Sequence, residues 1–464
     1  MNGAVDVTVV GGGISGLALA WHLRRAGLSV RVLEREDAPG GTIGSMQDGG
    51  WLIENGPNSA LETTPLFGEL FDGLGITGER LYADSSSDRR YILRGGKLHP
   101  LPMSPAAFIA SGLWTARGKL RLLREPLVGR AAGEESVAEF VERRLGREFL
   151  DYAINPFVAG VYAGDPAVLS VRAAFPKLYA LEEKYGGLIR GMIRGAGERR
   201  RRAEKAKDRA RMFTFRSGMQ ALPRALGRTL GESLALGAAA DALEISGGGF
   251  TVRYRQHGER RAVASRAAVL ALPAYAAREL VRPFAADAAD VLGRIAYPPV
   301  AEVFLGYPLG SIGRPLDGFG FLVPARERRS ILGTIWSSAL FAGRAPAGHA
   351  ALTTFVGGSR QPALALLDDE ALTAAVRRDL REIMDVRGEP VYRSIRRWER
   401  AIPQYAVGHL DLMDVLSRCE ERLGGLYFSG NYRGGIALGD CLIAADALAR
   451  RVAAGLKNTT RSTS

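Results

Sequence analysis

The stretch VTVVGGGISGLALAWHLRRAG, residues 7–27, joins an apolar run to a helical pattern of small residues through a cluster of glycines. The run Val5–Val10 is typical of a buried strand, and Ile14–Ala26 has the apolar spacing of a helix. Ser29–Glu34 predicts a second strand after this helix. A strand, a helix and a strand in this order predict an α/β fold with a parallel sheet.

The glycines of this stretch form a G-x-G-x-x-G motif at Gly11, Gly13 and Gly16, where the strand turns into the helix. The first glycine permits a tight turn, the second lets the backbone approach a pyrophosphate, and the third lets the helix pack on the strand. Glu34 ends the second strand 18 residues after Gly16, where a carboxylate binds ribose hydroxyls. The pattern predicts a dinucleotide with a free 2′-hydroxyl, either FAD or NAD rather than NADP.

The end of the chain contains a second junction of the same kind. Residues 425–452 read GLYFSGNYRGGIALGDCLIAADALARRV, in which the apolar stub Leu426–Phe428 runs into glycines and then into a helical pattern. Two stretches near the start, PGGTIGS at Pro39–Ser45 and ENGPNSA at Glu54–Ala60, extend the first glycine-rich region. This arrangement resembles the flavin site of the amine oxidase and phytoene desaturase superfamily, in which the terminal junction returns to the isoalloxazine ring of FAD.

The superfamily resemblance also implies the architecture. It implies an α/β protein with a Rossmann-like FAD-binding domain of the GR2 type, a mixed-sheet substrate domain and a helical, membrane-contacting domain. We expect the FAD-binding domain in residues 1–85, 212–284 and 390–457. The helical domain is expected in residues 86–211, and the substrate domain in residues 285–389 with parts of 86–211.

Four blocks of the chain resemble the oxygen-dependent protoporphyrinogen oxidase family more closely: NPFVAGVYAGDPAVLS (155–170), DGFGFLVP (317–324), WERAIPQYAVGH (398–409) and GNYRGGIALGDC (430–441). The resemblance covers almost the whole chain. It implies an FAD-dependent oxidase that converts protoporphyrinogen IX to protoporphyrin IX in haem biosynthesis, with three O₂ reduced to three H₂O₂. Oxidation of coproporphyrinogen III stays open as an alternative, as do a carotenoid-type desaturase, an amine oxidase and a non-catalytic flavin- or haem-handling protein at a membrane surface.

The resemblance implies one non-covalent FAD per chain, because no cysteine lies where monoamine oxidases attach their flavin. The residues expected to bind it come from the two junctions, the segments between them, and the strand near Ala239–Ala242 that is expected beside the adenine. They are Gly11, Gly12, Gly13, Ile14, Ser15, Gly16, Glu34, Arg35, Gly41, Thr42, Gly56, Pro57, Asn58, Ser59, Ala240, Trp398, Gly430, Gly435, Ile436, Ala437 and Leu438. No metal site is expected, since no two of the five histidines have metal-ligand spacing and only two cysteines occur.

A porphyrinogen site requires apolar walls and a cation for a propionate carboxylate. The residues that the resemblance assigns to substrate binding are Arg90, Gly160, Ala163, Phe319, Leu322 and Phe355. Arg89 is equally available for the carboxylate, and the sequence does not separate it from Arg90. Without the resemblance, these residues are typical of an exposed arginine, core aromatic residues and turns. No catalytic residue is assigned, and His409 is interpreted as structural.

The net charge is +13, and residues 194–211 contribute +6 through nine Arg/Lys against three Asp/Glu. No nucleic-acid recognition motif accompanies this run, so nucleic acid is not expected as a partner. No apolar run is long enough to span a bilayer, and the start of the chain lacks the pattern of a signal peptide. Residues 97–127 mix Phe108, Ile109, Leu113 and Trp114 with basic residues, which favours an interfacial helix and leaves core packing with a solvated basic face open as the alternative. We expect porphyrinogen and O₂ as substrates. The protein is expected in the cytoplasm, held peripherally at the inner face of the cell membrane. A second copy in a homodimer and a downstream haem-pathway enzyme are further partners to test.

Overall fold

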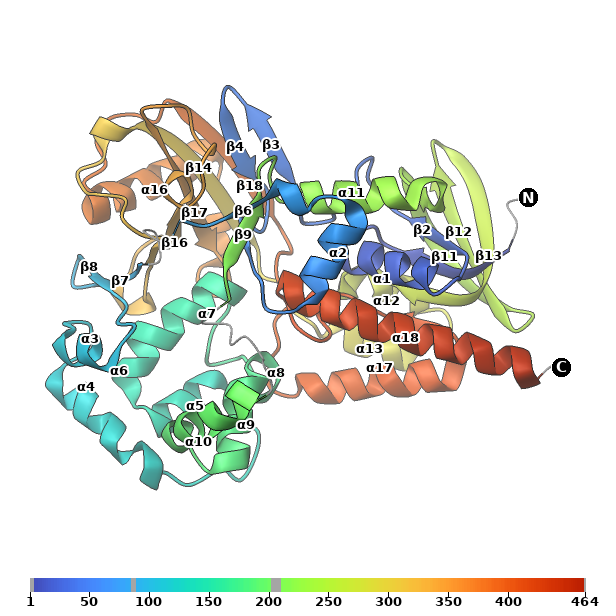
Figure 1. Cartoon of the computed structure of the whole chain (residues 1–464), viewed down its shortest axis with the longest axis horizontal. Helices are drawn as coiled ribbons and strands as arrows, with labels where there is room; N and C mark the ends of the chain where they lie inside the picture. The colour runs from blue at the N-terminus through green and yellow to red at the C-terminus, as the bar shows by residue number, and fades with distance from the viewer. Residues whose placement is uncertain (1–3, 85–88, 202–209, 463–464) are drawn as a thin grey trace.

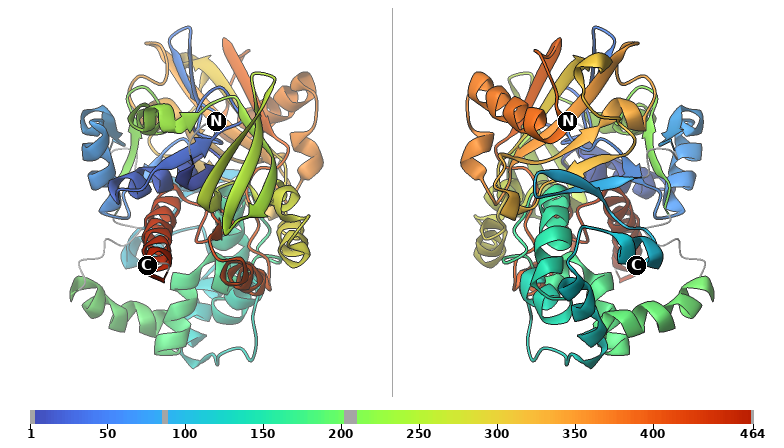
Figure 2. Two further views of the ribbon diagram at one scale, coloured as in Figure 1. Left: turned by 90° about the vertical axis from the view of Figure 1, so that its right-hand side faces the viewer. Right: turned by 90° about the vertical axis from the view of Figure 1, so that its left-hand side faces the viewer.

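The computed structural model describes residues 4–84, 89–201 and 210–462 (Figure 1). Its elements gather in three groups: a sheet flanked by long helices, a mixed sheet, and a helical segment. In Figure 1 the sheet with long helices lies on the right, with both termini, and the mixed sheet lies above the helical segment on the left. The turned views agree with this division, since the mixed sheet and the helical segment stay at opposite ends of the molecule (Figure 2).

The first sheet has seven strands in the order β10-β2-β1-β13-β12-β11, with β19 paired to β13. Its parallel centre consists of β1 (Val5–Val10), β2 (Val30–Leu33), the end of β13 (Glu259–Leu270) and β19 (Leu426–Phe428). The outer strands are β10 (Leu234–Ala235), β11 (Ala238–Ser246) and β12 (Gly249–Gln256). The predicted strand–helix–strand unit is confirmed, with the helix α1 at Ile14–Arg25.

Helices cover both faces of this sheet. Because successive side chains of a strand point to opposite faces, Val9 packs into the core beneath α1, whereas Val10 packs into the core on the other side. The helices on the first side are α1, α2 (Leu66–Leu74), α11 (Ala221–Leu230) and α18 (Leu438–Ser462). Those on the second side are α12 (Ala274–Val281), α13 (Ala286–Gly293) and α17 (His409–Leu423).

The mixed sheet also has seven strands, in the order β18-β14-β17-β16-β15-β7-β8. All neighbours are antiparallel except β7 and β15. Helix α16 (Asp369–Met384) covers one face, and the side chain of Asp368 caps its first turn by accepting the N–H of Ala371 at 2.8 Å. The strands are β7 (Arg90–Arg94), β8 (Lys97–Pro100), β14 (Val300–Pro308), β15 (Gly320–Leu322), β16 (Ile331–Trp336), β17 (His349–Gly357) and β18 (Tyr392–Trp398).

One predicted domain boundary is wrong, and one expectation is made definite. The substrate domain was expected to include parts of 86–211, and β7 and β8 are such a part, because they make a hairpin at the edge of the mixed sheet. Residues 390–457 do not all belong with the first sheet, because β18 pairs with β14 of the mixed sheet. These strands are short or rich in arginine, so their local sequence does not predict a strand. They become strands because they pair with neighbours that are distant in the sequence.

The single helix predicted in residues 97–127 does not form. Three short helices form there, and the linker between the first two buries Leu113 and Trp114, as the alternative of core packing implied. The indole of Trp114 stacks on Phe149 with ring centroids 4.7 Å apart, so this side chain belongs to the core of the segment. The helices are α3 (Pro105–Ala110), α4 (Ala116–Arg121), η3 (Leu122–Leu127), α5 (Val137–Arg144), α6 (Arg147–Phe149), α7 (Asn155–Tyr162), α8 (Val171–Ala174), α9 (Pro176–Tyr185) and α10 (Leu188–Arg201).

Shorter strands connect the three groups. The hairpin of β3 (Ser45–Asp48) and β4 (Trp51–Glu54) reaches the mixed sheet, where the ring of Trp51 lies 5.8 Å from that of Phe304. The three-stranded sheet β5-β9-β6 joins the segment after this hairpin to the chain returning from α10. Its strands are β5 (Ala60–Leu61), β6 (Arg80–Tyr82) and β9 (Met212–Phe215).

A buried ion-pair network fixes the helical segment. The guanidinium of Arg144 is fully buried and lies 3.0 Å from the carboxylate of Glu125 and 2.8 Å from that of Glu182. Glu125 also accepts the N–H groups of Leu188 and Ile189, at 2.7 and 3.1 Å. The network therefore joins η3, α5, α9 and the start of α10.

Replacing Arg144 by alanine should destabilise the protein by about 3–5 kcal/mol, because it leaves the buried carboxylate of Glu125 without its cation and Glu182 with Arg143 alone. Urea unfolding followed by circular dichroism measures the change. Arg253→Ala is the matched control, since Arg253 pairs with Glu244 on an exposed surface, and its unfolding midpoint should not move. An equal, small effect of both substitutions would contradict a structural role for the network.

Candidate active site

The two glycine-rich junctions lie at one edge of the first sheet. Parallel strands end at the same edge, and here β1, β13 and β19 are neighbours in that order. The N–H of Ala271 donates to the carbonyl of Val10 at 2.8 Å, and the N–H of Ser429 donates to the carbonyl of Leu270 at 3.0 Å. The end of β13 thus lies between the junction after β1 and the junction after β19. Because both junctions are hydrogen-bonded to it, the distance between them is fixed.

The junction after β1 presents bare backbone. Gly11 has φ +109°, and a side chain there would overlap the carbonyl oxygen of Ala271. A Cβ on Gly13 would meet nothing closer than the Cα of Gly41, 4.0 Å away, so backbone is open on this side. No side chain caps the N-terminus of α1, and no acidic residue lies in its first turn. Exposed N–H groups and a positive helix end fit the pyrophosphate of FAD.

Glu34 lies beside this junction and is buried. Its carboxylate accepts the N–H of Gly12 at 2.6 Å and the N–H of Glu36 at 2.8 Å. The N–H of Ala238 donates to the Glu34 carbonyl at 2.7 Å, so β11, which carries the predicted residue Ala240, begins next to it. A carboxylate fixed in this way fits the ribose hydroxyls, with the β11 strand alongside.

Arg35 and Trp398 are placed less decisively than the glycines. The Arg35 side chain is exposed and pairs with Glu36 at 2.8 Å. Trp398 ends the edge strand β18, where the guanidinium of Arg396 lies 4.4 Å from its ring centroid. Both residues are therefore accessible, and no contact in the structure ties them to the two junctions.

The loop after β4 carries four further predicted residues, and the mixed sheet holds it. The N–H of Gly56 donates to Glu302 at 3.0 Å, and the side-chain amide of Asn58 donates to the same carboxylate at 2.9 Å. Pro57 and Ser59 are half-buried in the same loop. A carboxylate of β14 thus positions a loop that is expected to contact the cofactor.

The terminal junction is held by Tyr405. Its hydroxyl donates to the carbonyl of Asn431 at 2.7 Å and accepts the N–H of Gly435 at 2.9 Å. His409 stacks on the Tyr405 ring at 4.2 Å, and its Nε2 lies 2.9 Å from the Tyr432 carbonyl. Burial lowers the pKa of His409. The interpretation of His409 as structural agrees with these contacts.

The turn from Gly430 leads directly into α18, whose first residues are the predicted cofactor contacts. Ile436 and Ala437 precede the helix, and Leu438 begins it. The thiol of Cys441 in the first turn interacts with the hydroxyl of Ser15 in α1. The two helices therefore begin side by side at the same edge of the sheet, as Figure 1 shows for α1 and α18.

The predicted substrate residues form a wall between α7 and the mixed sheet. A Cβ added to Gly160 would lie 2.5 Å from a methyl carbon of Leu322, so α7 and β15 are in direct contact there. Ala163 ends α7 with φ +47° and packs in one apolar cluster with Phe355 of β17. Gly160 is exposed and Leu322 is half-buried, so this part of the wall is open.

Arg90 and Arg89 differ in their partners. The guanidinium of Arg89 lies 2.7 Å from the carboxylate of Asp317, which also accepts the hydroxyl of Tyr91 at 2.8 Å. Arg90 makes no ion pair with the described residues, and its guanidinium lies 5.9 Å from the ring centroid of Phe319. The structure therefore separates two arginines that the sequence left equivalent: Arg89 is held by Asp317, whereas Arg90 has no ion-pair partner among the described residues.

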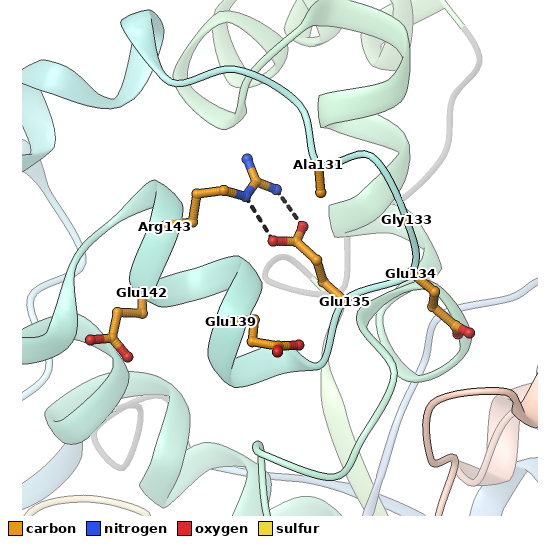
Figure 3. Close-up of a pocket in the computed structure, with 7 residues that line it drawn as sticks. All are labelled: Ala131, Gly133, Glu134, Glu135, Glu139, Glu142 and Arg143. Atoms are coloured by element: carbon orange, nitrogen blue, oxygen red, sulfur yellow. Dashed lines mark hydrogen bonds and ion pairs between the residues drawn. The ribbon is translucent and has the colours of Figure 1, made fainter.

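A hollow of about 480 Å³ beside α5 does not fit an acidic substrate (Figure 3). Four glutamates and one arginine line it, and Figure 3 shows Glu135 and Arg143 directed toward each other. Glu139 caps α5 through Ser136, and Glu134 accepts the N–H of Gly408 at 2.9 Å. These carboxylates are used for local structure, and they would repel a propionate.

Sequence reasoning missed Glu302 and the role of Tyr405. Tyr405 belongs to the quoted IPQY block, but its two hydrogen bonds depend on a turn that lies 26 and 30 residues later. Glu302 is the one acid in the apolar run VAEVFLGYP of β14. An isolated carboxylate in a buried strand is costly unless it is hydrogen-bonded, and this signal was available in the sequence.

Tyr405→Phe should release FAD about tenfold faster than the unaltered protein, because the Gly435 N–H loses its acceptor and the terminal turn loosens. The rise of flavin fluorescence after dilution measures the release. Tyr392→Phe is the matched control, since the Tyr392 hydroxyl bonds to Asp48 at an exposed site. Equal release rates for both variants would remove Tyr405 from the cofactor site.

Comparison with known proteins agrees with this geometry. The family model described as flavin containing amine oxidoreductase matches residues 14–453. Protoporphyrinogen oxidase 1, chloroplastic, of Arabidopsis thaliana is 35% identical over 94% of this chain and 86% of its own length. Coproporphyrinogen III oxidase of Bacillus subtilis (strain 168) is 28% identical over 95% of this chain and 96% of its own length. A crystal structure from Exiguobacterium sp. 255-15 superposes with a TM-score of 0.81 at 25% identity, over 97% of this chain and 98% of that one.

These matches extend over nearly the whole chain. The family model begins at residue 14, directly after Gly11–Gly13, and includes the other segments that form the site. They confirm the α/β FAD-binding fold, FAD as the cofactor and the oxidase class that the sequence predicted. The resemblance to protoporphyrinogen oxidases is confirmed as well. The chain belongs to the family of flavin-containing amine oxidoreductases.

Proposed function

We propose that this protein oxidises protoporphyrinogen IX to protoporphyrin IX, with three O₂ reduced to three H₂O₂. The observation that carries the proposal is the arrangement of Arg90 over Phe319, beside the open apolar wall of Gly160 and Leu322. A porphyrinogen has an apolar macrocycle with carboxylates on its edge. A cation that makes no ion pair with the described residues, next to an apolar wall, matches that distribution of charge.

The bound FAD supplies hydride acceptance from the macrocycle and reoxidation by O₂. The residues of the chain bind the substrate, orient it and exclude water from it. The apolar wall shields the macrocycle from water. Arg90 binds a carboxylate on one edge of the macrocycle and so determines which edge enters the site last. Since the charged arginine side chain is exposed, it can form this contact without breaking a pair inside the protein.

Coproporphyrinogen III is the second candidate substrate, and the Bacillus subtilis relative is named for it. It carries four propionates instead of two, so it needs cations at more than one edge of the slot. Near Arg90, both Arg89 and Arg94 are paired, with Asp317 and Glu148 at 2.7 Å each. This pairing favours the substrate with fewer carboxylates, and comparison of kcat/KM on the two porphyrinogens decides between them.

Arg90→Ala should raise KM for protoporphyrinogen about tenfold or more while the flavin content stays unchanged, because a charge-assisted hydrogen bond is lost. Steady-state oxidation followed by porphyrin fluorescence measures KM. Arg89→Ala is the control, and its KM should stay within about twofold, since Arg89 is already held by Asp317. A larger effect in Arg89→Ala than in Arg90→Ala would move the anchor to the neighbouring residue.

We propose further that the protein binds peripherally to an anionic membrane, at the inner face of the cell membrane. Leu120 of α4 and Leu123 and Leu127 of η3 are 63%, 72% and 84% exposed. Arg117 and Arg124 are exposed beside them. Adjacent apolar and basic side chains are typical of a surface that enters a headgroup layer.

Further features support this surface. Glu125 ties η3 to α10, which exposes Met192 and Ile193. Within the described residues, no helix has the length and apolar character needed to cross a bilayer. Part of the basic run 194–211 lies outside the described residues, namely 202–209. Surface attachment through η3 is therefore the mode that we propose.

Flotation with vesicles of phosphatidylcholine and phosphatidylserine tests the membrane surface. The unaltered protein should float at low salt, and Leu123→Glu with Leu127→Glu should bind about a hundredfold more weakly, because two leucines no longer enter the bilayer. Leu366→Glu is the control, since Leu366 is 59% exposed on a different part of the molecule. Recovery of the unaltered protein in the unbound fraction at low salt would contradict the proposal.

A further inference from the structure

Glu302 lies at the centre of the face that the mixed sheet turns toward the cofactor loop. Side chains alternate along β14, and Val303 and Leu305 pack into the core beneath α16. On the opposite face, Val300 packs against the end of α7, and Phe304 packs against Trp51 of β4. Glu302 lies between these two apolar contacts and is only 3% exposed.

The Glu302 carboxylate connects the cofactor side with the substrate side. Its Oε2 accepts the N–H of Gly56 at 3.0 Å, and its Oε1 accepts the side-chain amide of Asn58 at 2.9 Å. In the strand register it stands opposite Phe355 of β17, so the two side chains share one face. Phe355 is a predicted substrate residue, whereas Asn58 is a predicted cofactor residue.

No cation neutralises Glu302 among the described residues. On β4, the nearby Glu54 is paired with Arg344 at 2.7 Å. On β18, the register partner Arg396 places its guanidinium over the Trp398 ring. Burial raises the pKa of Glu302 to about 8; hydrogen bonds from Asn58 and Gly56 oppose the rise, and the charge of Glu54 adds to it. The carboxyl group therefore keeps its proton below about pH 8 and loses it above.

The two protonation states make different demands on Asn58. An ionised carboxylate only accepts hydrogen bonds, so it holds the NH₂ end of the Asn58 amide. A protonated carboxyl can donate its O–H, and the oxygen end of the Asn58 amide is then the matching acceptor. The Gly56 N–H occupies the other carboxyl oxygen in both states. The NH₂ group of Asn58 also donates to the Gly56 carbonyl at 3.2 Å, so reversal of the amide breaks this hydrogen bond as well.

We propose that Glu302 is a positioning residue of the flavin site, which sets the end of the Asn58 amide that faces the cofactor. The inference deepens the proposed function and rests on it for its kinetic consequence, because a reversed amide presents either a donor or an acceptor beside the flavin. Glu302→Gln imitates the protonated state at every pH, because its NH₂ group donates to the Asn58 oxygen as the O–H does.

The flavin absorbance spectrum of the purified holoenzyme, recorded from about pH 6 to about pH 10, tests the proposal. The unaltered protein should show a spectral change with its midpoint near pH 8. Glu302→Gln should lose this change and keep the low-pH spectrum throughout. A full change with the same midpoint in Glu302→Gln would overturn the proposal.

Asp379→Asn is the matched control. Asp379 is a buried carboxylate of α16 that accepts the N–H of Ser330 at 2.7 Å, on the side of the mixed sheet away from the cofactor loop. Its variant should keep the spectral change of the unaltered protein, and loss of the change in this variant would overturn the assignment to Glu302. Asn58→Ala retains Glu302 and should also lose the change; a full change in this variant would overturn the role of Asn58.

Kinetics with protoporphyrinogen distinguish a positioning role of Glu302 from a purely structural role. In Glu302→Gln the pH dependence of kcat near pH 8 should disappear while KM changes by less than about twofold. An unaltered pH profile of kcat in this variant would contradict the positioning role. If no porphyrinogen is oxidised by the unaltered protein, the proposed function fails, whereas the spectral titration needs only bound FAD and still decides the role of Glu302.

Discussion

The convergence of parallel strand ends at one edge of the first sheet is the constraint on which the site depends. Parallel strands deliver their carboxyl ends to the same edge, and β1, β13 and β19 are adjacent. The two glycine-rich turns, one near each end of the chain, therefore lie in the same layer of the fold. Within this layer, Gly430 is 400 residues along the chain from Val30 of β2. A cofactor as long as FAD needs two such turns, one at the pyrophosphate and one at the flavin.

The remaining parts of the site reach this edge through a few polar contacts. The carbonyl of Tyr405 accepts the N–H of Ser170 from the helical segment, at 2.8 Å, while its hydroxyl holds the terminal turn. Glu302 does the same for the mixed sheet by holding the Gly56 turn. The side chains of Tyr405 and Glu302 are buried, so their contacts are largely shielded from water and constrain the distance between two groups of elements. The apolar wall and the cofactor cradle are thereby fixed relative to each other.

The sequence was sufficient for the local features and insufficient for the long-range ones. The carboxylate of Glu34 depends on Gly12 and Glu36, which are close in the chain, and the spacing of the motif predicted it. Gly11 was predicted by the same motif, although the carbonyl that it approaches belongs to the distant Ala271. Burial of Trp114 and the strand state of β18 depend on partners far along the chain, at Phe149 and β14. Choice between Arg89 and Arg90 depended on Asp317, more than 200 residues away. The pattern of apolar and polar residues along the chain does not predict an ion pair between residues so far apart.

The exposed position of Arg90 has an energetic consequence. A buried arginine such as Arg344 must be paired, because an isolated buried charge is expensive. An exposed arginine in water gains only about 1 kcal/mol or less from a partner, so Arg90 loses little by having no ion-pair partner among the described residues. In the binding mode that we propose, an apolar macrocycle covers Arg90, and its contact with a propionate is then shielded from water and contributes about 1.5–3 kcal/mol. In that mode the anchor acts mainly after the substrate has entered, and it selects orientation more than it adds initial affinity.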